Sequence, residues 1–365
     1  MMGVLWAVAA FYFTGWSTDR VKLGTRICGH SLTSALESLD DDKSIEWVTV
    51  NDASADAGAE VLPLYPLPTV YLPGHNYTLN NVQTRNLQMA LDLSVGGRFV
   101  SVLRTIDTGR LAAVGTVLEI LELDPQYRED GVLRRIVVTC HATEVVRIQS
   151  VVNPEALELS HQLRNPYEYA SCTVEPVSSE DGTVEEGILD DYREVRDLYM
   201  SGVGTHDDDH WLRQQLTPST FPEAVSHSFW ETAHLWQTLC ATIRTGYQLR
   251  LQSDRNELLI DAALRKGGPL ELPIHLEDLD PEDRRPVYAL EQRLQQEWIE
   301  TGLDPCLDFQ RILQGPHRSE VLANLIRRER GRLERLAEQT QELTTSSVDQ
   351  FSPPGKGAWF DDSLW

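Results

Sequence analysis

The spacing of the apolar residues changes once along this chain, near Ser178. Before that point the apolar residues form short runs bounded by glycine, proline or polar residues, a pattern typical of β-strands. After it they recur every three to four residues over long stretches, which is typical of amphipathic helices. A chain divided in this way is expected to fold as an α+β protein, with a β-rich part followed by a helical part.

The β-rich part is predicted to cover residues 61–177. Pro63 and Pro66 place the first apolar run at a sheet edge or a strand end, because proline donates no hydrogen bond to a ladder. A short helix is predicted over 82–91, capped by Asn80 or Asn81. Strands are predicted at 61–67 with a continuation at 69–72, and at 99–103, 111–121, 136–140, 144–152 and within 165–177. Such a series of short strands predicts a small curled β-sheet or pseudobarrel.

Gly115 interrupts the predicted strand at 111–121. A glycine inside a strand pattern commonly marks a bulge or a bend. We therefore expect the sheet to change direction or register at this residue.

The helical part is predicted to cover residues 178–343 and to form a bundle. An acidic, glycine-containing segment at 179–186 is expected to be the loop that leads into it. Helices are predicted at 188–199, 222–251, 255–264, 287–301 and 319–343. Outside these two parts, residues 1–60 are expected to be a presequence or disordered linker, and residues 344–365 a flexible tail.

The apolar segment Gly3–Phe13 is too short to span a membrane as a helix. It also lacks the preceding positive charge of a signal peptide, and Ala7-Val8-Ala9 lies inside the apolar run instead of after it. We therefore expect a soluble intracellular protein without a membrane partner. A short signal or a plastid-type presequence remains the alternative, and only secretion would give meaning to the glycosylation sequon that begins at Asn76.

Charge and cysteine content exclude several classes of protein. The net charge is −24, from 56 acidic and 32 basic residues, and such a surface repels the phosphates of nucleic acids. The 5 cysteines contain no C-x-x-C pair, so zinc-ribbon, RING and thioredoxin-like sites are unsupported. An odd number of widely spaced cysteines suits free thiols in a reducing compartment, and core packing is the expected role of Cys140 and Cys172.

Four motifs in the β-rich part resemble, in order, those of the N-terminal substrate-binding domain of Lon proteases. They are Val61–Leu67 with Val70–Gly74, then Ala113–Ile120, then Val137–Cys140 with Val145–Ile148, then Asn165–Glu175. Arg255-Asn256-Glu257-Leu258-Leu259 is also similar to a helix of that family. Departures occur at Cys140-His141, at Val146 and at His75-Asn76-Tyr77. The resemblance implies a curled β domain that binds unfolded or client proteins.

The enzymatic parts of a Lon protease have no counterpart in this sequence. A Walker A motif is absent, and the Gly355-Lys356 pair is followed by a glycine. A Ser–Lys protease needs a buried lysine, and Lys266 is the only lysine within the predicted folded parts. No G-x-S-x-G or H-E-x-x-H motif occurs either. We therefore expect no catalytic, cofactor-binding or metal-binding residues and no cofactor, and we cannot assign peptide-binding residues from the sequence.

Three other groups of residues admit a functional and a structural interpretation. The segment His206-Asp207-Asp208-Asp209-His210 could hold a metal, although a solvated loop is expected. Phe229, Trp230, Leu235, Trp236 and Leu239 could form a ligand cage, although helix packing is expected. Arg327, Arg328, Arg330, Arg332 and Arg335, interleaved with glutamates, predict a salt-bridged helix face, with a nucleic-acid stripe as the alternative.

Three functional hypotheses follow. The first is a non-catalytic protein-binding module that recognises unfolded or client proteins for proteolysis or quality control, with a separate protease or a ubiquitin-ligase assembly as its partner. A curled sheet could bind an extended peptide at an edge through main-chain hydrogen bonds. The second is a structural scaffold whose helical half binds one fixed partner. An unrecognised hydrolase is a third, for which the sequence offers no constellation. A zinc-bound ligand-binding module, which accompanies this type of domain in some receptors, is unsupported because paired cysteines are absent.

Overall fold

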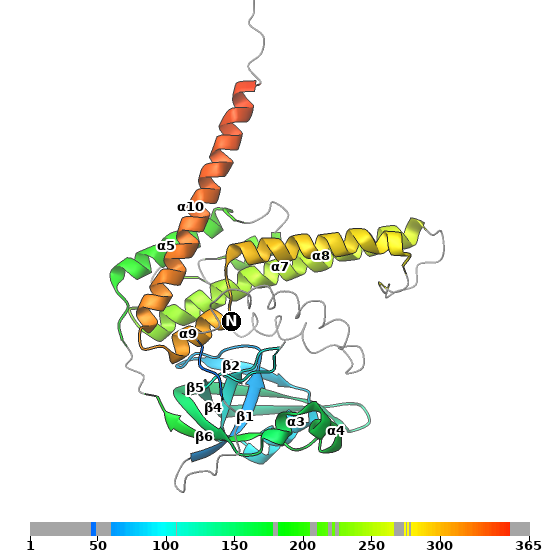
Figure 1. Cartoon of the computed structure of the whole chain (residues 1–365), viewed down its shortest axis with the longest axis vertical. Helices are drawn as coiled ribbons and strands as arrows, with labels where there is room; N and C mark the ends of the chain where they lie inside the picture. Colours follow the sequence, from blue (N-terminus) through cyan, green and yellow to red (C-terminus); the bar gives the residue numbers. More distant parts are fainter. Residues whose placement is uncertain are drawn as a thin grey trace, which may run out of the picture.

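A computed structural model describes residues 45–48, 60–106, 108–177, 182–204, 210–217, 221–222, 226–265, 274, 276 and 279–350, with side chains to 339 other than those of 210 and 213. A six-stranded mixed sheet carries a group of long helices on one side and two short helices, α3 and α4, on the other (Figure 1). The predicted α+β class is confirmed. Among the helices of the described residues, none is long and apolar enough to cross a bilayer.

The strands form a nearly closed ring. They are β1 (Glu60–Leu67), β2 (Asn76–Asn81), β3 (Arg98–Leu103), β4 (Val114–Tyr127), β5 (Leu133–Val151) and β6 (Ser171–Pro176). Their order is β2-β5-β4-β3-β1-β6, and β6 pairs again with β5. Only β1 and β3 run parallel. The second pairing of β6 closes five strands into a ring and leaves β2 outside it.

Strand β5 replaces the two strands predicted at 136–140 and 144–152, so that prediction is wrong. The intervening His141-Ala142-Thr143 contains no turn residue, and β5 continues through it against β2 and β4. Strand β2 was not predicted, because its polar sequence NYTLNN lacks an apolar run and ends in the two asparagines assigned to a helix cap. The helix itself, α3 (Thr84–Leu93), forms close to its predicted place, with Gln83 at the cap position.

Of the two predicted placements for the prolines of β1, the sheet edge is wrong, because β1 lies between β3 and β6. Pro66 does lie at a strand end, one residue before the end of β1 at Leu67. The first half of β1, which contains Pro63, pairs with β6, and its second half, which contains Pro66, pairs with β3. Each half of the strand therefore uses only one edge, which lets the ladder tolerate residues that lack an N–H. The segment 45–48, predicted to be linker, forms an isolated bridge outside the strands, between Trp47 and Ala112, and the Val48 N–H donates to the Leu111 carbonyl at 2.8 Å.

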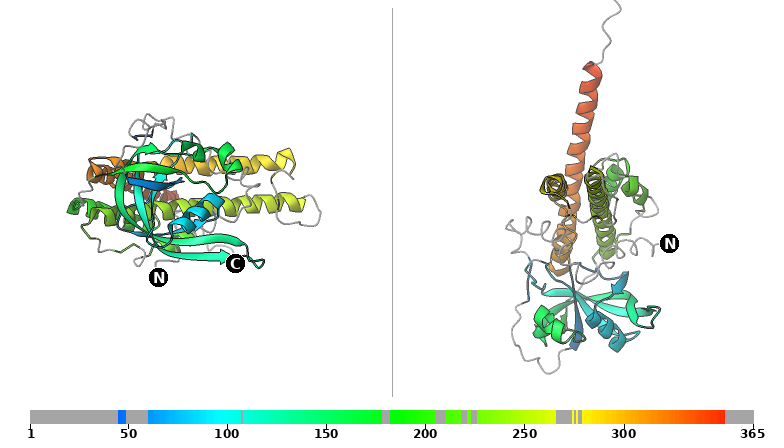
Figure 2. Two further views of the ribbon diagram at one scale, coloured as in Figure 1. Left: turned by 90° about the horizontal axis from the view of Figure 1, so that it is seen from below. Right: turned by 90° about the vertical axis from the view of Figure 1, so that its right-hand side faces the viewer.

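Alternate side chains of the strands enter two apolar clusters on opposite faces of the sheet. One face, which includes Tyr65, Phe99 and Leu118, is covered by Met89 and Ala90 of α3. We call this the α3-side cluster. The other face, which includes Leu64 and Val100, belongs to a larger cluster that extends into the long helices. Both faces are buried, so the sheet is the middle layer of three (Figure 2).

The described residues of the helical part form two short and four longer helices. They are α5 (Glu186–Met200), α6 (His210–Gln215), α7 (Phe229–Arg265), α8 (Pro281–Thr301), α9 (Leu307–Gln314) and α10 (Arg318–Gln350). The two helices predicted at 222–251 and 255–264 are one helix, α7, because Ser253 and Asp254 do not interrupt the backbone hydrogen bonding. Helix α10 continues beyond the predicted end at 343 and projects from the rest of the molecule (Figure 2). The short helices α4 (Leu159–Arg164), α6 and α9, and the 3-10 turn η2 (Pro154–Leu157), were not predicted.

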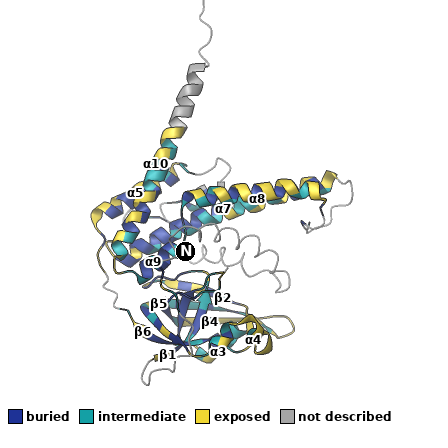
Figure 3. Ribbon diagram, viewed as in Figure 1, coloured by how far each residue is buried: buried dark blue, intermediate teal, exposed yellow. Residues whose placement is uncertain are grey.

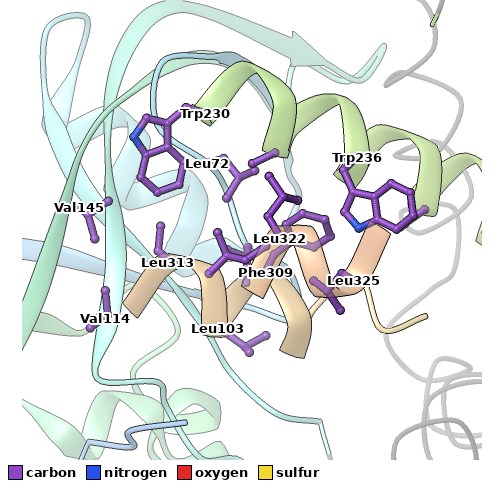
Figure 4. Packing of buried hydrophobic residues seen from close by; sticks show 14 of the residues in the cluster. Leu72, Leu103, Val114, Val145, Trp230, Trp236, Phe309, Leu313, Leu322 and Leu325 are labelled. Atoms are coloured by element: carbon purple, nitrogen blue, oxygen red, sulfur yellow. The ribbon is translucent and has the colours of Figure 1, made fainter. Parts of the chain in front are cut away.

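Helix α9 joins the helical part to the sheet. Its Phe309 and Leu313 lie between Leu103 and Val114 of the sheet and Leu322 of α10 (Figure 4). Two buried glutamines add hydrogen bonds across the same junction. Gln310 Nε2 donates to the Val114 carbonyl at 2.9 Å, and Gln237 Nε2 of α7 donates to the Val70 carbonyl at 2.9 Å.

Helices α7 and α8 form an antiparallel arm with a second, smaller core at its far end. There Leu259 and Ala262 of α7 pack with Leu279 and Val287. Figure 3 shows exposed residues along the outer surface of both helices. The arm is therefore held together by its own apolar contacts beyond the point where it leaves the main core.

The bulge or bend predicted at Gly115 does not occur there, because the register shifts of β4 fall at Val117/Leu118 and beyond. A glycine is needed at this position because β3 approaches it closely. A Cβ at Gly115 would lie 2.6 Å from the Ser101 carbonyl oxygen of β3. We expect Gly115→Ala to lower the free energy of unfolding by about 2 kcal/mol or more, because rigid backbone must move. Urea unfolding would measure this. Gly187→Ala, where a Cβ meets nothing within 4 Å in helix α5, is the matched control and should be neutral or stabilising.

We expect Gln310→Leu to destabilise the chain by about 1–2 kcal/mol, because the buried Val114 carbonyl would lose its side-chain donor. The loss is limited because Gln310 Oε1 itself has no partner among the described residues. Gln296→Leu, on the exposed side of α8, provides the control in the same unfolding experiment. A Gln310→Leu variant as stable as wild type would show that this hydrogen bond does not join the two parts.

Candidate functional site

Among the described residues, strand β2 has one edge that pairs with no other strand. Every other strand of the sheet pairs with at least two neighbours, whereas β2 pairs only with β5, from Asn76 opposite His141 to Asn81 opposite Ile136. A free edge presents unpaired N–H and C=O groups and can accept an added strand from another polypeptide. This edge is the candidate site.

The other exposed edge in the sheet is protected. Strand β4 extends beyond its pairing with β3, so its segment 121–127 has one unpaired side. That segment contains Pro125 and the exposed acids Glu122 and Asp124. Proline and charge are the residues with which proteins block strand addition. Strand β2, with the sequence NYTLNN, contains neither.

The register shows which groups of β2 face outward. The Ala142 N–H donates to the His75 carbonyl at 2.9 Å, so His75 faces β5. By the alternation of an antiparallel ladder, Tyr77 and Leu79 face β5 as well, and the backbone groups of Asn76, Thr78 and Asn80 point away from it. Within the described residues, no hydrogen bond engages the Thr78 backbone on its outer side. The side chains of Asn76 and Thr78 are exposed and neutral.

Buried tyrosines hold β2 in place. The Tyr77 hydroxyl accepts a hydrogen bond from the Leu72 N–H at 2.9 Å and donates to the Leu72 carbonyl at 3.1 Å. At the other end of the strand, the Tyr65 hydroxyl donates to Asn81 Oδ1 at 2.5 Å. Burial raises the pKa of both tyrosines, so both hydroxyls remain protonated donors. The edge is thus fixed before any partner arrives, which lowers the entropy lost on binding.

A stacked pair of histidines connects the start of β2 to helix α7. The rings of His75 and His234 have centroids 3.8 Å apart and an interplanar angle of 13°. His75 Nε2 also lies 3.3 Å from the Trp230 carbonyl oxygen. Burial lowers the pKa of His75, and burial together with the charge of His75 lowers the pKa of His234 to about 4. Both rings are therefore neutral at pH 7, and their stacking depends on that neutrality.

Several residues that the sequence analysis considered as metal ligands or catalytic groups lie outside the described residues. The segment 206–209 lies outside the described residues, as does the side chain of His210, and the described residues contain no group of three or more metal-ligating side chains. All four lysines, including Lys266 and Lys356, also lie outside the described residues. Cys140 and Cys172 are buried free thiols, as predicted.

The aromatic series and the arginine series both have structural roles. Phe229, Trp230, Leu235, Trp236 and Leu239 belong to the large apolar cluster, which confirms helix packing. Arg327 and Arg330 of α10 both pair with Asp191 of α5, the former at 2.9 Å, and this confirms a salt-bridged helix face. The sequence contained no signal for the β2 edge, because an edge exists only relative to the pairing of the other strands.

Proteins similar to this chain occur among solved structures. No protein-family model matches the chain, and no curated protein matches it. Among solved structures, the chain is similar to the Lon N-terminal domain protein from Xanthomonas campestris, with 19% identity, 44% of this chain and 92% of that chain covered, and a TM-score of 0.29. It is also similar to the N-terminal domain of the Lon protease of the Mycobacterium avium complex, with 15% identity, 51% and 98% covered, and a TM-score of 0.28. These scores are too low for function to be carried from either protein to this chain.

The histidine pair predicts a pH dependence of stability. The unfolded chain binds a proton at His234 near the ordinary pKa of 6.5, whereas the folded chain binds it only near 4. The unfolded state therefore holds more protons between these values, so stability is complete above about pH 6.5 and falls as the pH drops toward 4, by up to about 3 kcal/mol. Burial raises the pKa of Asp308 to about 6, and this shifts stability in the opposite direction. The wild type and the variants compared below all keep Asp308, so its contribution is the same in each.

We expect His234→Phe, which keeps an aromatic ring against His75, to flatten the decline between pH 6.5 and 4.5 in urea unfolding. The exposed His317, changed to Gln, provides the control and should leave the pH profile unchanged. A His234→Phe profile parallel to that of the wild type would contradict the assigned role of the pair.

Proposed function

We propose that the chain is a non-catalytic protein-binding module that accepts an extended segment of another polypeptide as an added strand on the outer edge of β2. The observation that supports this proposal is the contrast between the two exposed edges. The β4 edge is blocked by Pro125 and acidic residues, whereas the β2 edge has neither proline nor charge and is held rigid by buried tyrosines.

Strand addition would suit clients with exposed backbone. Most of the affinity in this mode comes from main-chain hydrogen bonds, so any unfolded segment without proline can satisfy them. The neutral side chains of Asn76 and Thr78 add little sequence preference. The motif resemblance to Lon substrate-binding domains implies the same class of partner, namely unfolded or client proteins. In this proposal the chain delivers clients to a separate protease or to a ubiquitin-ligase assembly, and has no catalytic role of its own.

The α7–α8 arm supports a second candidate function, a scaffold that binds one fixed partner. Ile260, Leu264 and Tyr288 are exposed near the far end of the arm, beside its own small core. Arg265 of α7 pairs with Asp283 of α8 at 3.1 Å. Ile260 and Tyr288 each lie five residues nearer the main core than these two, so they occupy similar positions along the arm. A partner bound there would be independent of the β2 edge.

The proposal predicts that Thr78→Pro weakens binding of an unfolded polypeptide by at least about tenfold. The substitution removes an outward N–H and places a pyrrolidine ring where the added strand would pair, while the inner ladder to β5 is unaffected. Thr78→Val keeps the N–H and is the matched control. Fluorescence anisotropy of a labelled, reduced and alkylated polypeptide with the full chain would measure both dissociation constants.

Equal affinity of the Thr78→Pro and Thr78→Val variants, with both folded by circular dichroism, would overturn the β2 edge as the binding site. Isolation of partners by pull-down separates the two functions. Many sub-stoichiometric partners that an unfolded competitor displaces support client binding. One stoichiometric partner that the competitor leaves in place, and that an Ile260→Asp and Leu264→Asp variant loses, supports the scaffold.

A further inference from the structure

The sheet face beside the β2 edge has no acid, lysine or arginine for two strands and becomes acidic on the third. Asn76, Thr78 and Asn80 of β2 project from the face opposite the α3-side cluster, because Tyr77 and Leu79 belong to that cluster. Their register partners on β5 are His141, Thr139 and Val137, and the next partners, on β4, are Glu119, Glu122 and Asp124. Strands lie about 4.8 Å apart, so these acids are about 10 Å from β2.

Two copies of this chain repel each other over most of their surface. The net charge is −24, and a large charge of one sign disfavours self-association. If two copies met at their β2 edges, the acids of the two β4 strands would be five strand spacings apart, about 24 Å, whereas exposed charges in physiological salt are largely screened beyond about 8 Å. The β2 edge is therefore a place where a second copy can approach while the acids of the two sheets stay apart.

The outward backbone groups of β2 are self-complementary in one antiparallel register. Pairing needs residues whose N–H and C=O groups point outward on both strands, and in β2 these are Asn76, Thr78 and Asn80. A twofold axis at Thr78 places Thr78 opposite Thr78 of the second copy, and Asn76 opposite Asn80. An axis at Tyr77 or at Leu79 leaves one of the three without an outward partner in β2. The register centred on Thr78 therefore forms the most main-chain hydrogen bonds.

The side chains that this register brings together also complement each other. Asn76 Oδ1 lies 2.8 Å from His141 Nδ1, and Asn76 Nδ2 has no partner among the described residues. Asn80 Oδ1 is buried and also has no partner among the described residues. With the axis at Thr78, this donor of one copy lies opposite this acceptor of the other, and a rotation of the Asn80 amide joins them. At the centre, a cross-strand pair of threonines is favourable.

We propose that a second copy of this chain binds the β2 edge, with the two β2 strands antiparallel about a twofold axis at Thr78, so that the two sheets become one. The second copy occupies the surface to which the proposed function assigns clients, so the dimer is a resting form that a client must open. Formation of the dimer does not itself depend on client binding. A single strand pair is a small interface, so we expect a dissociation constant of about 10–100 µM.

The test is sedimentation velocity of the full chain at pH 7, in about 0.15 M salt and over about 5–500 µM protein. We expect the wild type to change from monomer to dimer within this range. Thr78→Lys keeps the backbone N–H but places two lysines directly opposite each other, so dimerisation should weaken at least about tenfold, and Thr78→Glu should do the same. Ser160→Lys, at an exposed position of α4, is the matched control and should keep the dimer.

An equimolar mixture of the Thr78→Lys and Thr78→Glu variants tests the register. With the axis at Thr78, a lysine of one copy lies opposite a glutamate of the other, so the mixture should dimerise although each variant alone does not. A wild type that stays monomeric over the whole range, a Thr78→Lys variant that dimerises like the wild type, or a monomeric mixture would each contradict the proposal.

These outcomes are distinct from a failure of client binding. Thr78→Lys retains the N–H with which an unfolded polypeptide would pair, whereas Thr78→Pro lacks it. If clients bind the β2 edge, the anisotropy experiment should show binding by Thr78→Lys, whether or not the wild type dimerises.

Discussion

Leu103 and Val114 of the sheet pack against Phe309 and Leu313 of α9, and neither the sheet nor the helices could remove these side chains from water alone. The cluster that they belong to extends from β1 to α10, so the rest of the structure is arranged around it. Helix α7 is held against the start of β2 because its first turns belong to this cluster. The buried donors Gln237 and Gln310 fix the orientation, since a carbonyl in an apolar junction without its donor would be unfavourable.

Closure of five strands into a ring follows from the length of β5. Its first half pairs with β2, its last half pairs with β6, and β4 accompanies both. Ring closure gives each of its strands two neighbours, and among the described residues β2 and the far part of β4 each keep a side that pairs with no strand. Only the latter carries proline and acids. The β-rich part therefore concentrates its capacity for strand addition on one side, next to the junction with the helices.

Charge is distributed unevenly over this acidic chain. On the long helices, acids and arginines form networks. Asp191 contacts Arg327 and Arg330, and the fully buried Glu329 accepts hydrogen bonds from Tyr199 and Arg332. A buried carboxylate is tolerated only with such partners. Among the described residues, most of the ion pairs thus stabilise the helices, and fewer lie on the β-rich part.

The succession of a β-rich part and a helical part could be predicted from the sequence because hydrophobic periodicity is local. The α+β class, the helix near 82–91, the packing role of the Trp230 and Trp236 series and the salt-bridged face of α10 all followed from residue spacing. Periodicity could not show that β5 and α7 are each continuous, because whether polar residues such as Thr143 or Asp254 interrupt an element depends on what packs against them. Strand β2 has no apolar run, and its status as a free edge was decided by ring closure between strands distant in sequence.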